Sequence, residues 1–358
     1  MPITTNESLV LDGSHGEGGG QIVRTALSLS ASTGRPIRIE RIRAGRPRPG
    51  LAAQHVAAAR ALAAVSGARL LGDALGSSFL EFTPTHEPRA GAYEIDIGLA
   101  RAGGSAGATT LVLQAMLHAL LVATGRSTLV LRGGTHVPWS PTFEYVHDVW
   151  LPTLADMGIA AHTELERCGF HPVGGGVVRA TIDGVAPGRI ASLDRRERGP
   201  LLRVAGTALS CGVPGHVRDR MIARARIALA AEGISVDFES TEANAACAGT
   251  ALFMTAHYGS SRAGFSALGE RGKPAERVAD EAVRALVGFH RSGAAVDEHL
   301  ADQLLVFAAL ASGSSRLAVE RVTSHLTTNA WVIEQFDLAQ VLTTTRDHGS
   351  ALIVINPR

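Results

Sequence analysis

The apolar residues of this chain repeat one pattern three times: an apolar helical run, a small residue with a glycine, and a short strand. Helical runs are predicted at residues 26–34, 116–125 and 304–313, and the strands at 36–43, 127–132 and 316–322. Each helical run closes on a glycine, namely Gly34, Gly125 or Gly313. We expect all three glycines to end their helices in the left-handed conformation.

A second helix is expected after each strand, at 51–65, 143–157 and 329–338. The fold class is therefore predicted to be α+β, with three repeated two-helix, four-strand units packed around a common centre. Residues 189–293 differ in character, with a charged run at 194–198 and an amphipathic run at 274–290. We expect two domains: a catalytic repeat domain (1–188 plus 294–358) and a small inserted α/β domain (189–293) before the last unit.

The charge balance argues against a protein that coats nucleic acid. The 358 residues include 34 Lys and Arg against 33 Asp and Glu, whereas non-specific nucleic-acid binding usually needs a strongly basic chain. One local basic cluster exists, with only Glu40 opposing it: Arg35, Arg38, Arg41, Arg43, Arg46 and Arg48. A solvated strand face is the alternative explanation for that cluster.

Cysteine usage and hydropathy point to a cytoplasmic protein without a membrane segment. Three scattered cysteines are too few for a disulfide framework or a zinc site. The first ten residues are polar, and the longest apolar run, at 111–125, is too short to span a bilayer.

The segment 12–24 carries the most distinctive local chemistry. A single carboxylate, Glu17, lies among glycines, and Arg24, Arg43 and Arg46 could hold oxyanions in bidentate fashion. One acid for a divalent cation plus several guanidiniums for phosphates is typical of a nucleotide or phosphate-ester enzyme. The spacing matches neither common phosphate-loop template. Glycine clusters recur at 133–134 and 174–176, so tight turns are the competing explanation.

The phase of the first strand changes at its end. Ile37 and Ile39 share one face, whereas Ile42 falls on the other, which predicts a bulge or strand end near Arg41. This change would re-aim Arg43 where the chain turns into the next helix. Gln54 is expected in the first turn of that helix, facing back toward the loop.

His325 stands out among 14 histidines by its position. It lies in the polar segment 323–329, after the third predicted strand and before a helix that we expect Thr327, Thr328 or Asn329 to cap. Loops of this kind often carry functional groups. Position alone leaves an ordinary surface role open.

Six motifs, in order, cover about residues 8 to 340. They are GEGGGQIVR at 16–24, IRAGR at 42–46, GSAGATTLVLQ at 104–114, GGGVV at 174–178, HLADQ at 299–303 and SHLTTN at 324–329. Together they resemble the RNA 3′-terminal phosphate cyclases. The resemblance implies a ligase that uses ATP to turn an RNA 3′-phosphate into a 2′,3′-cyclic phosphate, with AMP and pyrophosphate as products.

The resemblance also assigns the site. It implies that His325 forms a covalent adenylate, that Glu17 contacts Mg²⁺ or Mn²⁺, and that Asp302 could orient His325. The residues implied to contact nucleotide or phosphate are Arg24, Arg43, Arg46, Gln54, Gln114, His299, Asp302 and Gln303. We expect Arg24 to serve the ATP phosphates, and Arg43 and Arg46 to meet the RNA 3′-phosphate as well.

Three positions depart from what the family often carries: His299 for tyrosine, Ser324 for cysteine and His136 for an acidic residue. These changes would alter the lining of the nucleotide pocket and not the nucleophile. The expected partners are ATP and RNA with a 3′-phosphate end, and a homodimer is one option for assembly.

Three alternatives remain from the sequence. A non-catalytic RNA-processing relative would lack the nucleophilic histidine, which this chain has. An enolpyruvyl transferase would share the repeated architecture and need neither ATP nor a covalent histidine. A pure RNA-binding module that relies on stacking would be richer in aromatic residues than a chain with three Trp and three Tyr.

Overall fold

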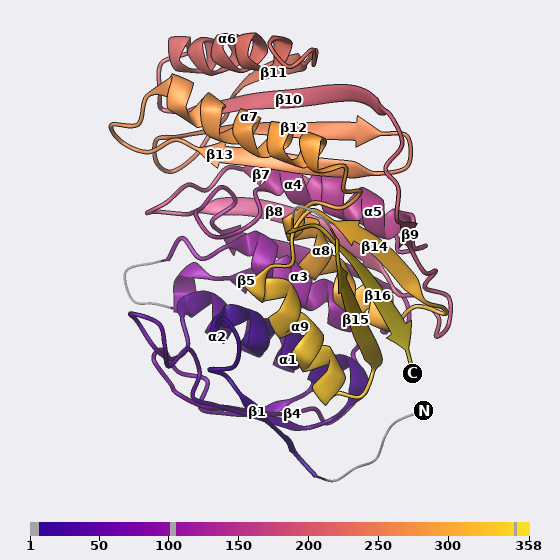
Figure 1. Cartoon of the computed structure of the whole chain (residues 1–358). Coiled ribbons are helices and arrows are strands. Elements are labelled where there is room, and N and C mark those ends of the chain that lie inside the picture. The colour runs from indigo at the N-terminus through magenta and orange to yellow at the C-terminus, as the bar shows by residue number, and fades with distance from the viewer. Residues whose placement is uncertain (1–6, 101–104, 347–348) are drawn as a thin grey trace.

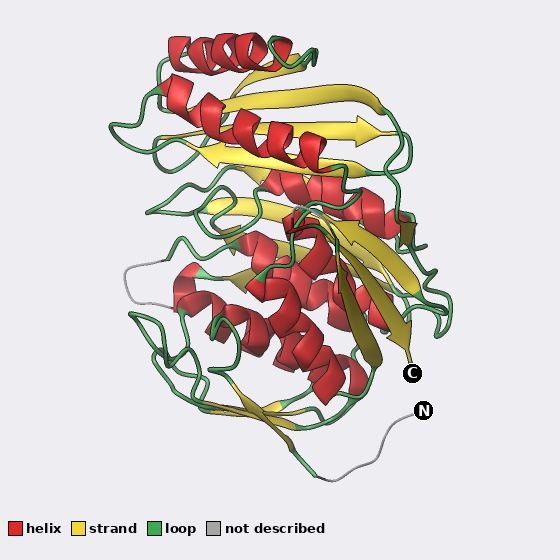
Figure 2. Cartoon of the chain, in the orientation of Figure 1, coloured by secondary structure: helices red, strands yellow, loops and turns green. Residues whose placement is uncertain are grey.

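The computed structural model describes residues 7–100, 105–346 and 349–358, so Gly104 of the 104–114 motif lies outside it. The described chain is a mixed α/β protein with four small four-stranded sheets. In Figures 1 and 2 the first three sheets surround a group of helices, and the fourth lies at the far end of the molecule. Within the described residues, no helix is both long and apolar enough to cross a membrane.

The first sheet has the order β1-β2-β4-β3, with β1 and β2 parallel and the other pairs antiparallel. Helix α1 connects β1 to β2, and α2 connects β2 to the β3–β4 hairpin. The bounds are β1 Leu9–Asp12, α1 Gly20–Thr33, β2 Ile37–Glu40, α2 Ala53–Ser66, β3 Arg69–Leu71 and β4 Leu80–Thr83.

The second sheet repeats this order as β5-β6-β8-β7, again with its first pair parallel. The predicted second helix at 143–157 forms three consecutive helical pieces, the middle one a π-turn. The bounds are β5 Ala92–Asp96, η1 Gly98–Ala100, α3 Thr109–Leu120, β6 Arg126–Gly133, α4 Phe143–Tyr145, η2 Val146–Trp150, α5 Leu151–Ala155, β7 Ala161–Arg167 and β8 Gly176–Asp183.

The third sheet has the corresponding order β9-β14-β16-β15, with β9 parallel to β14. Its first strand, β9, lies within the 189–293 range although it pairs with the C-terminal part of the chain. The bounds are β9 Asp194–Arg195, α8 Glu298–Ala309, β14 Ser315–Val319, α9 Ser324–Gln335, β15 Ala339–Thr345 and β16 Ala351–Pro357.

The fourth sheet, β11-β10-β12-β13, has a hydrophobic core of its own with α6 and α7. Arg198, at the entry to this segment, donates to the carbonyl oxygens of Phe289 (3.1 Å) and His290 (2.6 Å) at its exit. The two ends of the segment therefore lie together. The bounds are β10 Leu201–Cys211, α6 His216–Ala230, β11 Asp237–Glu242, β12 Gly249–Tyr258, β13 Arg262–Leu268 and α7 Ala275–Ser292.

The main core forms where the helices of the first three sheets meet. Helix α1 packs against α2, α3 and α9, and α8 packs against α9. Fully buried side chains such as Leu27, Val112 and Phe307 fill this centre. The apolar helical runs of the sequence are thus buried on several sides, which explains their nearly continuous hydrophobicity.

Two helix ends and one helix start differ from the sequence predictions. Gly34 ends α1 at φ 74°, as predicted. The predictions for Gly125 and Gly313 are wrong, because α3 ends at Leu120 and α8 at Ala309, each followed by a turn. Apolar residues continue past the last helical turn in both runs, so the apolar pattern overestimates the length of these helices.

Helix α9 begins earlier than predicted. Its N-cap is Thr323, whose hydroxyl accepts from the Leu326 amide at 3.0 Å. The predicted caps Thr327, Thr328 and Asn329 lie inside the helix. His325 is therefore the second residue of a helix, where the free amide groups and the helix dipole favour a bound anion.

Asp297 joins three parts of the chain next to α8. Its Oδ1 caps the helix by accepting from the Leu300 amide at 2.9 Å, and it also accepts from the Tyr145 hydroxyl at 2.7 Å. Its Oδ2 accepts from the Gly264 amide of β13 at 3.4 Å. One buried carboxylate thus connects the second, third and fourth sheets.

We predict that Asp297→Ala lowers the free energy of unfolding by about 2–4 kcal/mol, because the helix loses its cap and the buried Tyr145 hydroxyl loses its acceptor. Asp297→Asn keeps a capping oxygen and should lose clearly less. Urea unfolding followed by circular dichroism measures both. Equal losses for the two variants would contradict the capping role.

Candidate active site

The glycine-rich loop at 13–19 docks on helix α9. The Glu17 amide donates to the Thr328 hydroxyl at 3.3 Å, and the His15 ring stacks on Trp331 with centroids 4.0 Å apart. At Gly16, φ is +57° and an added Cβ would lie 2.4 Å from the Thr328 hydroxyl oxygen. The contact therefore requires glycine, and it joins segments more than 300 positions apart.

This docking brings Glu17, Arg46 and His325 together. Arg46 Nη2 donates to Glu17 Oε2 at 2.7 Å, and His325 Nε2 lies 3.2 Å from the same oxygen. The Glu17 side chain is 8% exposed, whereas that of His325 is 49% exposed and open to a substrate. Burial lowers the pKa of His325, and the nearby Arg24 and Arg46 charges lower it further, against the opposing effect of Glu17. A lowered pKa favours the neutral imidazole that a nucleophile needs.

The single carboxylate of Glu17 fits a metal site in which the substrate supplies most of the ligands. Among the described residues, no group of three or more His, Cys, Asp or Glu side chains is placed to hold a metal ion. A single carboxylate is nevertheless a common protein contribution to a Mg²⁺ site in which substrate phosphates supply other ligands. Glu17 suits that arrangement.

The N-terminus of α1 lies beside this group and is open to an anion. Its N-cap is Gly19, so no side chain caps the helix, and its first turn has no acidic residue. Arg24, one turn into the helix, donates to Gln21 Oε1 at 2.7 Å. Burial lowers the pKa of Arg24 to about 10, although Asp302 and Glu17 oppose the change.

His55 belongs to the same group and was missed from the sequence. Its Nδ1 accepts from the Ala52 amide at 3.0 Å, while its buried Nε2 has no partner within the described part. That Nε2 points at Gly20, where an added Cβ would lie 2.1 Å away. Burial, then the charges of Arg24 and Arg43, hold its pKa well below the usual value. The only sequence signal was its position next to Gln54.

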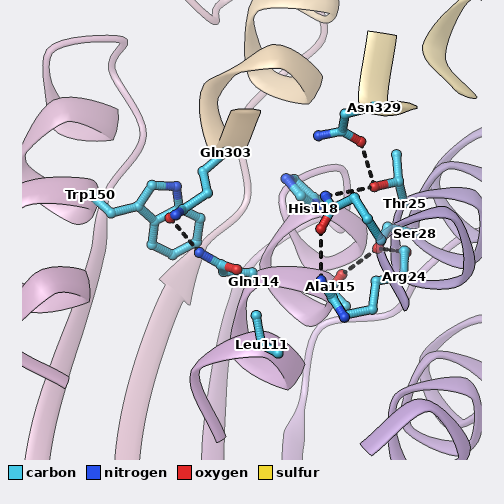
Figure 3. A pocket seen from close by; sticks show the side chains of 11 residues that line it. Arg24, Thr25, Ser28, Leu111, Gln114, Ala115, His118, Trp150, Gln303 and Asn329 are labelled. Carbon is cyan, nitrogen blue, oxygen red and sulfur yellow. Dashed lines mark hydrogen bonds between the residues drawn. The ribbon is translucent and has the colours of Figure 1, made fainter. Parts of the chain in front are cut away.

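Gln114 and Gln303 form the far wall of the site. Gln114 Nε2 donates to Gln303 Oε1 at 2.6 Å, and both line a cavity of about 20 Å³, large enough for one water. Arg24, His118 and Trp150 line the same cavity, as Figure 3 shows.

Asn329 ties this wall to α1. Its Oδ1 accepts from the Thr25 hydroxyl at 2.6 Å, and its Nδ2 donates to the backbone oxygen of Asp302 at 2.7 Å. Burial raises the pKa of Asp302 to about 8, although Arg24 opposes the change. Within the described part, the Asp302 carboxyl makes no hydrogen bond with His325, so the structure supplies no contact for the expected orienting role.

Arg43 and Gln54 lie on the other side, at a second and larger hollow of about 570 Å³. Strand β2 ends at Glu40, and Arg41 and Arg43 have φ values of 51° and 53°. The predicted strand end near Arg41 is therefore confirmed. Arg43 Nη1 donates to the Gly50 carbonyl at 2.8 Å. The residues predicted for the site thus form two neighbouring groups rather than one.

The three departures from the family pattern have different surroundings. The His299 side chain is 70% exposed, with its ring edge-on to Tyr145 at 6.5 Å. His136 is buried, lies 2.8 Å from Glu144 and stacks on Phe170. Burial alone would raise the pKa of Glu144, yet His136 brings it below its usual value. Ser324 is the first residue of α9.

Comparisons with known proteins agree on one family. The family model described as "RNA 3′-terminal phosphate cyclase" matches residues 15–342. A protein of that name from Methylococcus capsulatus is 54% identical over 97% of this chain and 96% of its own length. Its namesake from Trichormus variabilis is 49% identical over 92% and 94%, and that from Methanopyrus kandleri is 40% identical over 97% and 98%. A solved enolpyruvyl transferase, NikO from Streptomyces tendae, has 17% identity and a TM-score of 0.27, covering 62% of this chain and 38% of its own, which supports no inference.

We predict that His118 makes stability depend on pH. Burial lowers the pKa of His118 to about 3, and neither ring nitrogen has a hydrogen-bond partner within the described part. Between about pH 3 and 6.5 the unfolded chain therefore binds more protons, so the free energy of unfolding rises with pH by up to about 1.4 kcal/mol per unit.

His118→Leu should flatten this slope, as measured by urea unfolding between about pH 4.5 and 6.5. The exposed His162→Leu is the matched control. An unchanged slope in His118→Leu would show that other groups carry the dependence.

Proposed function

The chain belongs to the RNA 3′-terminal phosphate cyclase family, and we propose that it uses ATP to convert an RNA 3′-terminal phosphate into a 2′,3′-cyclic phosphate. One observation carries the chemical part of this proposal. His325 lies 3.2 Å from Glu17 at the junction of the glycine-rich loop and α9, with its ring half exposed. A partly exposed imidazole with a lowered pKa, next to arginines and two helix N-termini, suits attack on a phosphate.

In the first proposed step, the neutral imidazole of His325 attacks the α-phosphorus of ATP. The new P–N bond replaces the P–O bond to pyrophosphate, which leaves, and AMP stays on the ring as a phosphoramidate. Arg24 and the uncapped amides of α1 are the proposed groups that stabilise the phosphate oxygens. Gln114 and Gln303 are the proposed nucleotide contacts at the far wall.

We propose that Glu17 holds Mg²⁺ or Mn²⁺, with the substrate phosphates as further ligands. Such an ion supplies neutralisation of phosphate charge when bound. Arg46 donates to the same Oε2 atom. A cation at Glu17 would compete with Arg46 for that oxygen, and the guanidinium would then be available to phosphates.

In the second proposed step AMP moves to the RNA, and in the third the RNA end is cyclised and AMP leaves. An oxygen of the RNA 3′-phosphate attacks the adenylate phosphorus, the P–N bond breaks, and the imidazole is regenerated. The neighbouring 2′-hydroxyl then attacks the 3′-phosphorus, loses its proton and displaces AMP. Its fixed place on the same ribose supplies much of the rate. Arg43, at the larger hollow, is the proposed contact for the RNA phosphate.

We also propose that the fold consists of three copies of one unit with an inserted domain. The first three sheets share one strand order and one parallel first pair, which supports three copies of one unit. The separate core of α6, α7 and the fourth sheet supports an inserted domain within 189–293. Because β9 pairs with β14 of the third sheet, we propose that the inserted domain begins after Arg195.

A non-catalytic RNA-processing role is the alternative. It would not need a histidine at position 325, nor the arrangement of Glu17 and Arg46 around it. The relatives reported above are named as cyclases, which favours the enzyme.

We predict that His325→Asn abolishes the covalent adenylate and lowers cyclisation by at least about a thousandfold, because no other group replaces the nucleophile. The protein is incubated with α-³²P-labelled ATP and Mg²⁺, and label on the chain is measured on a denaturing gel. His216→Asn, an exposed histidine in the first turn of α6, is the matched control. Full labelling of His325→Asn would place the nucleophile elsewhere.

We predict that Glu17→Gln raises the Mg²⁺ midpoint of adenylation about tenfold, because the ion loses its carboxylate. Gly19→Ala should act in the same direction, since its Cβ would lie 1.9 Å from Glu17 Oε1 and displace the carboxylate. Gly288→Ala, where a Cβ meets nothing within 4 Å, is the control. Titration of Mg²⁺ against adduct yield is the measurement, and unchanged midpoints would make Glu17 structural.

A further inference from the structure

Hydrogen bonds between neighbouring loops hold the hollow beside Arg43 in shape. Its lining includes Arg43, Arg48, Pro49, Gln54, Leu75 and Ser105. The loops beneath it are fixed to each other: the Gly76 amide donates to the Leu51 carbonyl at 2.9 Å, and the Leu51 amide to the Ser77 carbonyl at 3.0 Å. With about 570 Å³ of space, it is in the size range of small-ligand sites.

The charge of this hollow is positive and uncompensated. Among the described residues, two arginines line it and no Asp or Glu does. In the same basic cluster, Arg38 is paired with Glu40 and Glu81, and Arg41 with Asp12. Arg48 is exposed and has no ion pair or hydrogen bond within the described part. A free guanidinium beside a hollow fits the phosphate groups of a ligand.

Besides the arginines, the lining combines apolar residues with the polar Gln54 and Ser105, and none of its described residues is aromatic. Pro49, Leu51 and Leu75 offer apolar surface, and the Leu75 side chain is 47% exposed. The apolar part of this wall suits contact with a base or ribose face, and the arginines suit backbone phosphates. The chemistry is therefore that of a single-stranded nucleotide chain.

A single turn of backbone separates the hollow from the group formed by Glu17, Arg46 and His325. The Arg46 amide donates to the Arg43 carbonyl at 3.0 Å. On one side of this turn the Arg46 side chain reaches Glu17, and on the other Arg43 faces the hollow. A chain whose terminal phosphate lies near Arg43 and Arg46 would place its preceding nucleotides over the hollow.

We propose that the hollow lined by Arg43, Arg48 and Gln54 binds the nucleotides that precede the 3′-phosphate of the RNA, with Arg48 contacting their backbone phosphates. This inference rests on the proposed cyclase reaction for the direction of the chain. It predicts that Arg48 matters for an RNA strand and not for a nucleoside 3′-phosphate, which has no preceding phosphate.

The test separates adenylation, transfer and binding in the full-length protein. Adduct is formed with α-³²P-labelled ATP, isolated, and mixed with either a nucleoside 3′-phosphate or a 3′-phosphorylated oligoribonucleotide of about ten residues. For Arg48→Ala we expect normal adduct, transfer to the oligonucleotide slower by about tenfold, and unchanged transfer to the nucleoside 3′-phosphate. Arg284→Ala is the control for loss of charge, because Arg284 is exposed on α7 and has no ion pair or hydrogen bond with the residues that the structure describes.

Binding of a fluorescein-labelled 3′-phosphorylated oligoribonucleotide, without ATP, gives an independent readout. Arg48→Ala should weaken binding and lower the dependence on salt by about one phosphate contact. The proposal is overturned if both transfer substrates slow equally, if neither slows, or if Arg48→Ala changes the oligomeric state instead. If wild-type protein forms no adduct while RNA binding still depends on Arg48, the reaction fails and the subsite stands.

Discussion

The docking of the glycine-rich loop on helix α9 is the contact that fixes the geometry of the whole site. Thr328 fills the space that a side chain at Gly16 would occupy, and the His15 and Trp331 rings stack beside it. Further along the same interface, Thr25 and Asn329 hydrogen-bond. Because both partners are held by backbone and buried side chains, Glu17 and His325 meet without long flexible linkers. A shift of either element by a fraction of an ångström would change that pairing, which is the usual sensitivity of preorganised sites.

Burial shifts the pKa values of several ionisable groups around this junction, and for each of them it favours the neutral form. Burial moves Arg24, His55 and His325 toward their neutral forms, and it does the same to the Asp302 carboxyl. Arg24 is thus a buried cation whose burial is only partly offset by Asp302 and Glu17. A polyphosphate would supply the missing negative charge and the acceptors, including one for the unpartnered Nε2 of His55.

The sequence contained the local part of this arrangement and not the long-range part. Helical periodicity located the main helices, and the phase change at Ile42 indicated the end of β2, since both signals depend on neighbours a few residues away. The motifs located Glu17, Arg46 and His325 but not their mutual contacts. The start of α9 at Ser324 was missed because three other residues in that segment can also act as caps. His55 was missed because its significance depends on the space beside Gly20, which only the folded chain defines.

The bonds from Arg198 to the carbonyls of Phe289 and His290 have a consequence for the history and engineering of the chain. Where the two ends of a segment touch, the distance between its attachment points in the surrounding protein does not depend on the length of the segment. Such a segment can be exchanged, shortened or opened to create new termini without stretching its host. We therefore expect the fourth sheet with α6 and α7 to tolerate such changes better than the loop and helix that carry Glu17 and His325.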